Sequence, residues 1–236
     1  MDEQSRVAVI TGASQGLGQG IARAYRARGW RVVGTSRTIA ASDDPGFVTV
    51  AGDIGDPATG PKVIDAALDA FGRIDTLVNN AGIFIGGAFT ELTDAQFHAV
   101  QSTNVDGFFY TTQAAVSAML QGGGGHVVQI TTTLVEHAHS AIPSVIAALS
   151  KGGLAAATRS LAIEFAGRGI RANAVSPGVI GTTLHPPETH AALGALHPLG
   201  TIGTIEDVVR AVMFLEDSPF VTGEILHVDG GWIAGH

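Results

Sequence analysis

The chain has 236 residues, of which 45% are hydrophobic and 14% are charged, with a formal net charge of −8 and no cysteine. This length and composition predict a globular protein with a well-buried core, and the missing cysteine excludes disulfide bonds and thiol catalysis. The acidic charge disfavours a nucleic-acid partner, because such a partner needs clustered lysine and arginine.

Nothing in the sequence predicts a membrane span or a targeting segment. No apolar run reaches the ~18 residues that a spanning helix needs. The stretch before the first strand, residues 1–6, is too short and too acidic for a signal peptide. We therefore expect a cytoplasmic protein with no membrane partner.

Short β-rich runs alternate with helical patterns along the chain, which predicts a parallel sheet with helices on both faces. The expected strands are residues 7–10, 31–35, 47–50, 76–78, 127–130, 172–175 and 225–228. The expected helices are residues 18–28, 57–71, 94–101, 105–120, 143–166 and 205–215, with Thr93 and Thr204 as N-caps. The expected fold is therefore α/β, a Rossmann-type doubly wound sheet of about seven strands, in a single domain spanning residues 1–236.

Two connections carry turn signals. The link 37–46 contains Asp43-Asp44-Pro45-Gly46 and leaves little room for a helix. The four glycines of residues 122–125 are interpreted as a flexible turn into the next strand.

A glycine-rich loop follows the first strand and opens the first helix. Glycine tolerates the backbone angles of such a turn and lets a pyrophosphate approach the main chain. The helix N-terminus adds free N–H groups and the positive end of the helix dipole. The order of strand, loop and helix predicts dinucleotide binding rather than an ordinary turn. The expected contacts are Gly12, Ser14, Gln15, Gly16, Leu17 and Gly18.

The spacing of Gly12, Gly16 and Gly18 resembles the short-chain dehydrogenase/reductase family rather than the more familiar dinucleotide fingerprint. The resemblance covers nearly the whole chain, through Asn79-Asn80-Ala81-Gly82, Asn104-Val105, Ser150-Lys151, Asn173-Ala174-Val175-Ser176-Pro177-Gly178, Val221-Thr222-Gly223 and Asp229-Gly230-Gly231. It implies a nicotinamide coenzyme. Further coenzyme contacts that it implies are Ser36, Asp53, Ile54, Asn80, Ala81, Gly82, Lys151, Pro177, Gly178, Val179 and Thr182.

Arg37 follows the second strand, where an acidic residue would bind the ribose hydroxyls and repel a 2′-phosphate. Arginine instead offers a planar donor fork suited to phosphate. We therefore expect NADP(H) to be preferred over NAD(H), with an exposed surface arginine as the alternative. By resemblance Asp53 lies beside the adenine, although it could also merely end the third strand.

The resemblance implies that hydride passes between the nicotinamide and a carbonyl carbon while a tyrosine handles the proton. It assigns Lys151 to the lysine that follows the tyrosine by one helical turn, and Asn104 to a water-linked relay. Thr132 takes the place of the serine that positions the carbonyl, with Thr133 as the other possibility. Each residue also has a plain structural interpretation: a solvated lysine, a helix cap and a β-favouring strand end.

Ala147 stands four residues before Lys151, where the resemblance leads us to expect the tyrosine. A methyl group cannot donate a proton, so ordinary carbonyl reduction should be slow unless another group substitutes. Candidates are Glu136, His137 and His139, in the loop where the family lines its substrate pocket. No third ligand accompanies the two histidines, so no metal site is expected.

The stretch 181–203 is expected to form a lid over the substrate, in which His185, His190 and His197 are interpreted as surface residues. The family also implies a homotetramer, formed through the helix 105–120 and the C-terminal strand. The leading hypothesis is an NADPH-dependent oxidoreductase acting on a small carbonyl or conjugated alkene substrate. The rival is a non-catalytic NADP(H)-binding homologue that serves as a regulatory or structural subunit, which Ala147 favours.

Overall fold

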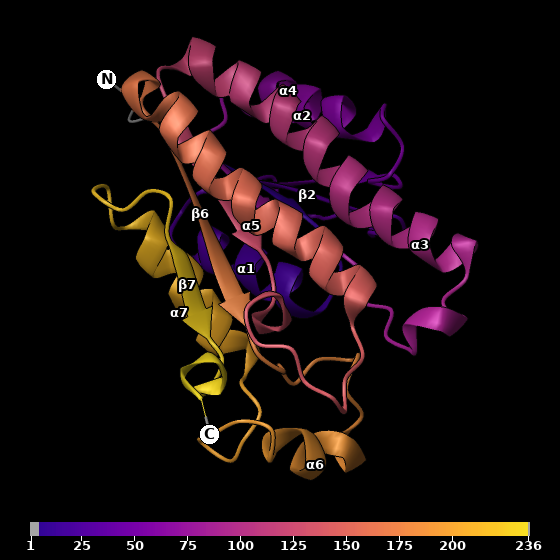
Figure 1. The fold of residues 1–236 in the computed structure, drawn as a ribbon. Helices are drawn as coiled ribbons and strands as arrows, with labels where there is room; N and C mark the ends of the chain where they lie inside the picture. The colour runs from indigo at the N-terminus through magenta and orange to yellow at the C-terminus, as the bar shows by residue number, and fades with distance from the viewer. Residues whose placement is uncertain (1–4, 236) are drawn as a thin grey trace.

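Seven parallel strands form one sheet in the order β3-β2-β1-β4-β5-β6-β7 in the computed structural model, which describes residues 5–235 (Figure 1). The strands are β1 Val7–Thr11, β2 Arg31–Ser36, β3 Phe47–Ala51, β4 Thr76–Asn79, β5 Gly125–Ile130, β6 Ile170–Pro177 and β7 Ile225–Val228. This confirms the predicted doubly wound α/β sheet. β6 is longer at both ends than the sequence pattern predicts, because Ile170 and Arg171 pair with the start of β5.

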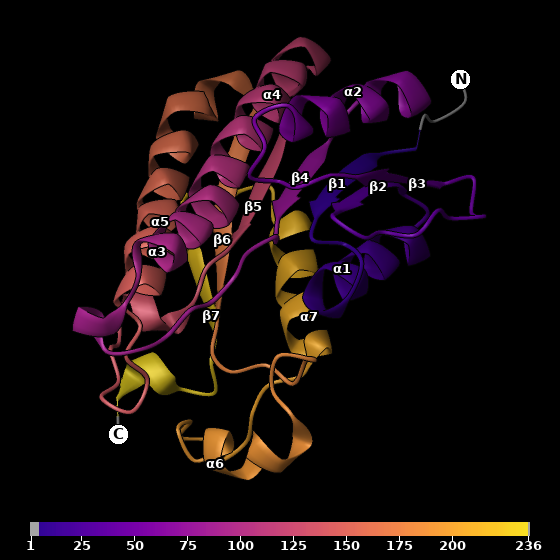
Figure 2. The same ribbon diagram turned by 90° about the vertical axis from the view of Figure 1, so that its right-hand side faces the viewer.

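Helices cover both faces of the sheet (Figure 2). The long helices are α1 Gly16–Ala27, α2 Thr59–Phe71, α4 Gly107–Gly122, α5 Val145–Phe165 and α7 Ile205–Glu216, and the shorter ones are α3 Asp94–Val100 and α6 His190–Gly194. Single 3₁₀ turns occupy Phe89–Glu91, Thr133–Val135, Ala166–Arg168, Pro187–Thr189 and Trp232–Ala234. α1 packs beside α7 on one face, while α2, α4 and α5 lie on the other.

Alternate residues of β1 supply the two hydrophobic cores. Ala8 and Ile10 pack with the residues of α1 and α7, whereas Val7 and Val9 pack with those of α2 and α4. A strand buried on both faces must be apolar throughout, which explains the continuous run that marks β1 in the sequence.

The chain reverses direction across the sheet between β1 and β4, since β2 and β3 lie on one side of β1 and the later strands on the other. In open α/β sheets, ligands bind at such a switch point, beyond the carboxyl ends of the strands. The glycine-rich loop after β1 and the residues after β4 meet there.

Thr93 and Thr204 are N-caps, as predicted. Each side chain accepts a hydrogen bond from the backbone three residues later, and the side chain of Gln96 or Asp207 bonds back to the cap residue. These two capping boxes fix where α3 and α7 begin.

The structure corrects the prediction of two separate helices over residues 94–120. α3 runs through a π-helical turn, Gln101–Asp106, directly into α4. Asn104 therefore lies inside a continuous helix and caps nothing. A π turn inserts one extra residue and often occurs at functional sites.

The two connections agree with the sequence. No helix occupies residues 37–46, and the glycine turn joins Gly122, the last residue of α4, to Gly125, the first of β5. Residues 1–4, which belong to the start that we interpret as lacking a signal peptide, lie outside the described residues, as does residue 236. Within the described chain, no helix is both long and apolar enough to cross a membrane.

A buried carboxylate joins four elements at the amino end of the sheet. Glu216 Oε2, at the end of α7, accepts hydrogen bonds from Tyr25 Oη of α1 at 2.9 Å and Thr76 Oγ1 of β4 at 2.8 Å. His126 Nδ1 of β5 lies 3.2 Å away, and Asn173 Nδ2 approaches His126 Nε2 at 3.1 Å. Because the Asn173 amide can only donate, the imidazole is neutral and carries its proton on Nδ1.

Burial and hydrogen bonding shift both titrating groups of this cluster. Burial raises the pKa of Glu216, but hydrogen bonds from His126, Thr76 and Tyr25 outweigh it and leave the pKa lowered. Burial also lowers the pKa of His126. The unfolded chain therefore binds more protons than the folded protein as the pH falls through the ordinary histidine and carboxyl ranges, so folded stability is lost on acidification.

We expect Glu216→Gln to lower the free energy of unfolding at pH 7 by ~1–3 kcal/mol, because it disturbs the hydrogen bonding of buried partners. Its stability should also fall less steeply than that of the wild type between pH 7 and pH 5. Urea denaturation at both pH values measures this. Glu164→Gln, on the exposed face of α5, is the control. A wild-type pH dependence in Glu216→Gln would show that this carboxylate is not the acid-sensitive group.

Candidate functional site

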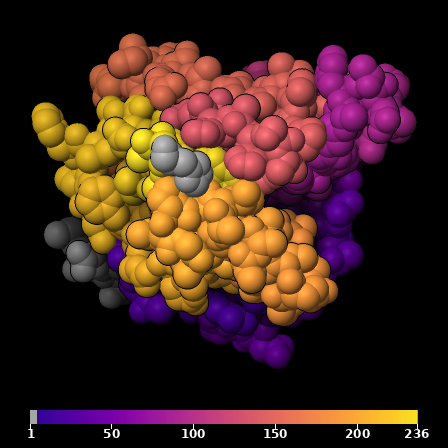
Figure 3. All heavy atoms as spheres, turned by 60° about the horizontal axis from the view of Figure 1, so that its bottom comes forward, coloured from indigo at the N-terminus to yellow at the C-terminus, as the bar shows by residue number. Residues whose placement is uncertain are grey.

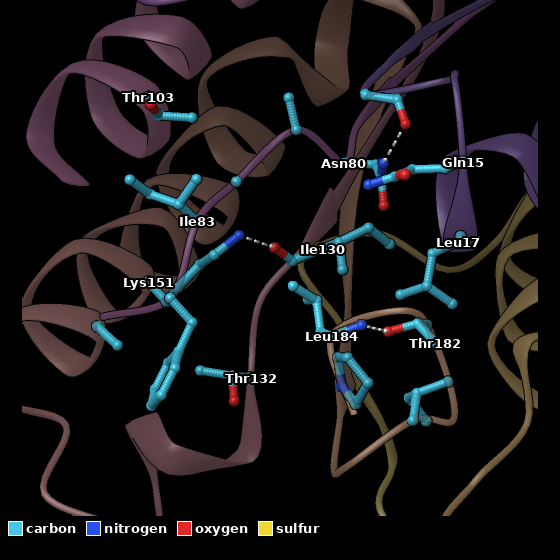
Figure 4. Close-up of a pocket in the computed structure, with 18 of the residues that line it drawn as sticks. Gln15, Leu17, Asn80, Ile83, Thr103, Ile130, Thr132, Lys151, Thr182 and Leu184 are labelled. Carbon is cyan, nitrogen blue, oxygen red and sulfur yellow. Dashed lines mark hydrogen bonds between the residues drawn. The ribbon is translucent and has the colours of Figure 1, made fainter. Parts of the chain in front are cut away.

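A cavity of about 720 Å³ lies beyond the carboxyl ends of the strands (Figure 4). The glycine loop and the end of β2 line one end, and the ends of β4, β5 and β6, the helix α5 and Trp232 line the other. Residues of the 181–203 segment complete the wall. Figure 4 shows Thr182 and Leu184 of that segment across the cavity from Lys151 and Thr132.

The glycine loop has the geometry of a phosphate cradle. Gly12 and Gly16 have φ angles of 68° and 54°, which disfavour any side chain. A Cβ on Gly18 would lie 2.2 Å from the Gly12 carbonyl oxygen, so the helix can start this close only without one. Gln15, the N-cap of α1, makes no side-chain cap bond. The helix N-terminus is therefore available to an anion.

Asn80 fixes the loop to β4. Its Nδ2 donates to the carbonyls of Thr11 at 2.9 Å and Gly12 at 3.3 Å. In return, Thr11 Oγ1 accepts from the backbone N–H groups of Asn80 at 3.0 Å and Ala81 at 2.9 Å. Four hydrogen bonds thus join the ends of β1 and β4 at the point where the strand order reverses.

Residues expected near the adenosine lie together at one end of the cavity. Arg37 is exposed on the wall, and Ile54 is buried beside it. Ser36 Oγ is buried with no hydrogen-bond partner among the described residues. Asp53 lies two residues beyond β3, and its Oδ1 accepts from Gly55 N at 3.0 Å. The buried, unpartnered hydroxyl beside an arginine marks a place for a polar ligand.

Lys151 reaches the cavity from α5. Its Nζ donates to the Ile130 carbonyl at 2.7 Å, as Figure 4 shows, and burial lowers its pKa from 10.5 to about 8. Ala147 lies one turn earlier on the same wall, is 2% exposed, and offers the cavity only a methyl group.

Thr132, and not Thr133, presents a hydroxyl to the cavity with its proton uncommitted. Thr132 Oγ1 accepts from Leu134 N at 3.4 Å. Thr133 Oγ1 donates to the Pro177 carbonyl at 2.8 Å and is 1% exposed. Of the two alternatives left open by the sequence, Thr132 is the one free to bind a ligand.

Asn104 does not line the cavity, so its expected place in the site needs correction. Its Oδ1 accepts from Ile83 N at 2.9 Å, and its Nδ2 donates to Ile83 O and to Ser150 Oγ, both at 3.1 Å. A Cβ on Gly82 would meet Lys151 Nζ at 3.0 Å and Asn104 Oδ1 at 3.2 Å. Asn104 therefore stands behind the wall, where it positions residue 83 and approaches Lys151.

The structure also moves the candidate proton donors. Glu136, His137 and His139 do not line the cavity. Glu136 pairs with His227 at 3.0 Å, and the His139 ring packs edge-on against Trp232. No group of three or more His, Asp or Glu residues that could hold a metal occurs in residues 5–235.

These geometric features agree with comparisons to known proteins. A family described as "Enoyl-(Acyl carrier protein) reductase" matches residues 12–233. The chain is 32% identical to the 3-oxoacyl-(acyl-carrier-protein) reductase FabG of Escherichia coli, and covers 98% of each sequence. It is 38% identical to the 2-(R)-hydroxypropyl-CoM dehydrogenase of Xanthobacter autotrophicus, over 98% of this chain and 99% of that one. The solved structure "ElxO with NADP Bound" superposes with a TM-score of 0.91 at 29% identity, over 98% of this chain and 100% of that one.

The chain belongs to the short-chain dehydrogenase/reductase family. It is thus an oxidoreductase by family, and its seven-stranded sheet is the fold of its structural neighbours.

Sequence reasoning missed two cavity residues that this family member places at the reacting end. His185 lines the cavity, half-buried, and burial followed by the charge of His190 lowers its pKa. Trp232 lines it from beyond β7. The cluster of histidines in the 181–203 segment was the available signal for His185.

The interpretation of these histidines as surface residues is wrong for His197, which is 3% exposed. His197 Nε2 accepts from Val179 N at 3.1 Å, and its Nδ1 lies 3.0 Å from the Leu193 carbonyl. The ring also packs edge-on against Trp232. His197 therefore ties the 181–203 segment to β6 and to the C-terminal turn.

Arg37 generates a prediction on coenzyme choice. No carboxylate or carbonyl among the described residues binds its guanidinium, so it is free to pair with a 2′-phosphate. We expect Arg37→Ala to weaken NADPH binding by about tenfold, since a hydrogen bond to a charged group contributes ~1.5–3 kcal/mol. NADH binding should change little. Calorimetric titration of wild type and variant with both coenzymes measures this, and equal affinity of the wild type for NADPH and NADH would contradict the assignment.

Proposed function

We propose that the protein is an NADPH-dependent oxidoreductase that transfers hydride to a carbonyl or conjugated alkene substrate. The observation that carries this proposal is one cavity that joins the phosphate cradle and Arg37 at one end to Lys151 and Thr132 at the other. The NADP and NADPH named in the titles of two ElxO structures support the choice of coenzyme.

The residues of the cavity fit the coenzyme. The side-chain-free space around Gly12, Gly16 and Gly18 suits a pyrophosphate, while Ser36 and Arg37 suit a 2′-phosphate. The proposed remaining contacts are Ser14, Gln15, Leu17, Asp53, Ile54, Asn80, Ala81, Gly82, Pro177, Gly178, Val179 and Thr182, all but one of which, Gly18, line the cavity together with the residues above. When bound, the coenzyme supplies the hydride.

The chain's own groups handle the substrate oxygen. The Thr132 hydroxyl donates to it, which polarises the carbonyl. The Lys151 ammonium holds the coenzyme ribose and places a positive charge beside the oxygen as negative charge develops there. We propose that Ala147 stands at the position of the family tyrosine, because it lies four residues before Lys151 on the same cavity wall.

The proton must then come from another group. Lys151, with its pKa lowered to about 8, can release a proton near neutral pH. The imidazole of His185 is the other titratable group at this end of the cavity. A conjugated alkene suits this site well, because its reduced carbon skeleton can take its proton later from water.

The rival function is a non-catalytic NADP(H)-binding homologue that acts as a regulatory or structural subunit. Ala147 favours it, since the cavity wall lacks the phenol. Lys151 and the fully hydrogen-bonded Asn104 favour an enzyme.

Further proposals concern organisation. We propose one coenzyme-binding domain over residues 1–236, with 181–203 as the lid, in a cytoplasmic homotetramer. Exposed apolar side chains on α4 and α5, Phe109, Val145, Leu149 and Ile163, support burial of these helices in an assembly.

Coenzyme binding and turnover test the proposal separately. We expect saturating NADPH to raise the melting temperature, because a ligand that binds the folded state stabilises it. NADPH should also be consumed with at least one member of a panel of ketones, quinones and enones. No thermal shift would contradict the coenzyme assignment. A shift with no consumption on the whole panel would favour the non-catalytic subunit.

Ala147→Tyr should create or increase NADPH-dependent ketone reduction. The new phenol would stand one turn from the Lys151 ammonium, and a nearby positive charge lowers the pKa of a phenol. A positioned general acid contributes ~10²–10⁴-fold in rate. Initial rates with a simple ketone measure the gain. Ala148→Tyr, one position along the helix, controls for a tyrosine that does not face the same wall. A folded, NADPH-binding Ala147→Tyr protein with no gain would show that the pocket serves other chemistry.

A further inference from the structure

Positive charge is distributed unevenly along the chain. No lysine or arginine occurs at residues 74–150, 172–209 or 211–236. All wall residues at the reacting end except Lys151 come from these three stretches. Among the described residues, the cations that line the cavity are Arg37, at the adenosine end, and Lys151.

The same wall is predominantly apolar. Ile83 and Phe84 come from the segment after β4, Leu134 and Ile142 from the loop after β5, Leu184 and Leu193 from the lid, and Trp232 from the C-terminal turn. Phe84 is 50% exposed and Leu184 is 74% exposed. Large apolar side chains that remain exposed around a cavity favour a ligand that covers them.

The loop after β5, the lid and the C-terminal turn meet around this end of the molecule. Trp232 touches His139 of the loop and His197 of the lid through ring contacts. Figure 3 shows the lid, in orange, adjoining the loop, in rose, on this face. Nearby charge is acidic: Glu136 lies in the loop and Glu188 in the lid, both exposed.

An anion on the substrate would find no free partner here. Lys151 Nζ already donates to Ile130 O at 2.7 Å and has the ribose as its proposed partner. Moving an unpaired anion from water into an apolar site is costly, whereas an apolar chain gains from the same burial.

We propose that the substrate of this protein is an uncharged, mainly apolar carbonyl or enone compound, and not an acyl group on an anionic carrier. This inference rests on the proposed function. It separates the protein from relatives whose names specify acyl carrier protein or coenzyme M.

Binding tests the inference independently of turnover. The probes are octanamide and octanoate, which share a chain length and differ in charge, titrated calorimetrically into the NADPH-bound protein at pH 7.5. We expect octanamide to bind at least ~10-fold more tightly, a difference of ~1.4 kcal/mol. Equal or tighter binding of octanoate would overturn the inference.

Turnover then separates this inference from the proposed function. The pair is 2-decanone and 9-oxodecanoate, for which we expect kcat/KM to favour the neutral ketone by at least ~10-fold, as in binding. A preference for 9-oxodecanoate would overturn the substrate class. Selective octanamide binding without turnover of either ketone supports the apolar site and counts against the catalytic proposal alone.

Two matched variants locate the effect on the cavity wall. Leu184→Lys adds a cation to the wall, and Leu199→Lys adds the same charge elsewhere on the lid, at a residue that is 76% exposed and does not line the cavity. We expect Leu184→Lys to tighten octanoate binding several-fold, and Leu199→Lys to leave it unchanged. An equal gain in both variants would mean that net charge, rather than the wall, sets the preference, and would overturn the inference.

Discussion

The Asn80 side chain holds the two strands on which the site depends. Its amide donates to the carbonyls of Thr11 and Gly12, while Thr11 Oγ1 accepts two backbone bonds from the start of the next segment. Gly18 needs the same spot to be free of a Cβ, which would lie 2.5 Å from Asn80 Nδ2. The phosphate cradle, the start of α1 and the path of residues 81–84 along the cavity are therefore set together by one polar side chain and three glycines.

Local rules in the sequence predicted much of the fold. β1 is apolar throughout because both of its faces are buried, and Thr93 and Thr204 are followed three residues later by the partners of a capping box. The π-helical turn around Asn104 escaped prediction, because no residue pattern distinguishes one extra residue inside a helix from a break between two helices. β6 was underestimated because its first residues include a buried arginine, Arg171, whose guanidinium donates to the Leu215 and Val221 carbonyls.

The site was predictable where it depends on the backbone and less so where it depends on tertiary contacts. Glycine spacing indicated the cradle, and motif order indicated Lys151 and Thr132. His197 was misjudged because its burial arises from Trp232 and the residue-179 backbone, which are distant in sequence. His185 and Glu136 exchanged their expected importance for the same reason, since only the folded lid determines which of them lines the cavity.

The π-helical turn also has a consequence for the helix that contains it. Each residue of an α-helix advances by ~100° about the axis, so one inserted residue rotates everything downstream by that angle relative to everything upstream. The direction in which α3 presents its side chains is thereby uncoupled from that of α4, although the two form one continuous rod. Asn104 can point inward to the Ile83 backbone while the residues of α4 are free to serve a different neighbour. The surface that α4 presents can therefore diverge between relatives without disturbing the inward amide.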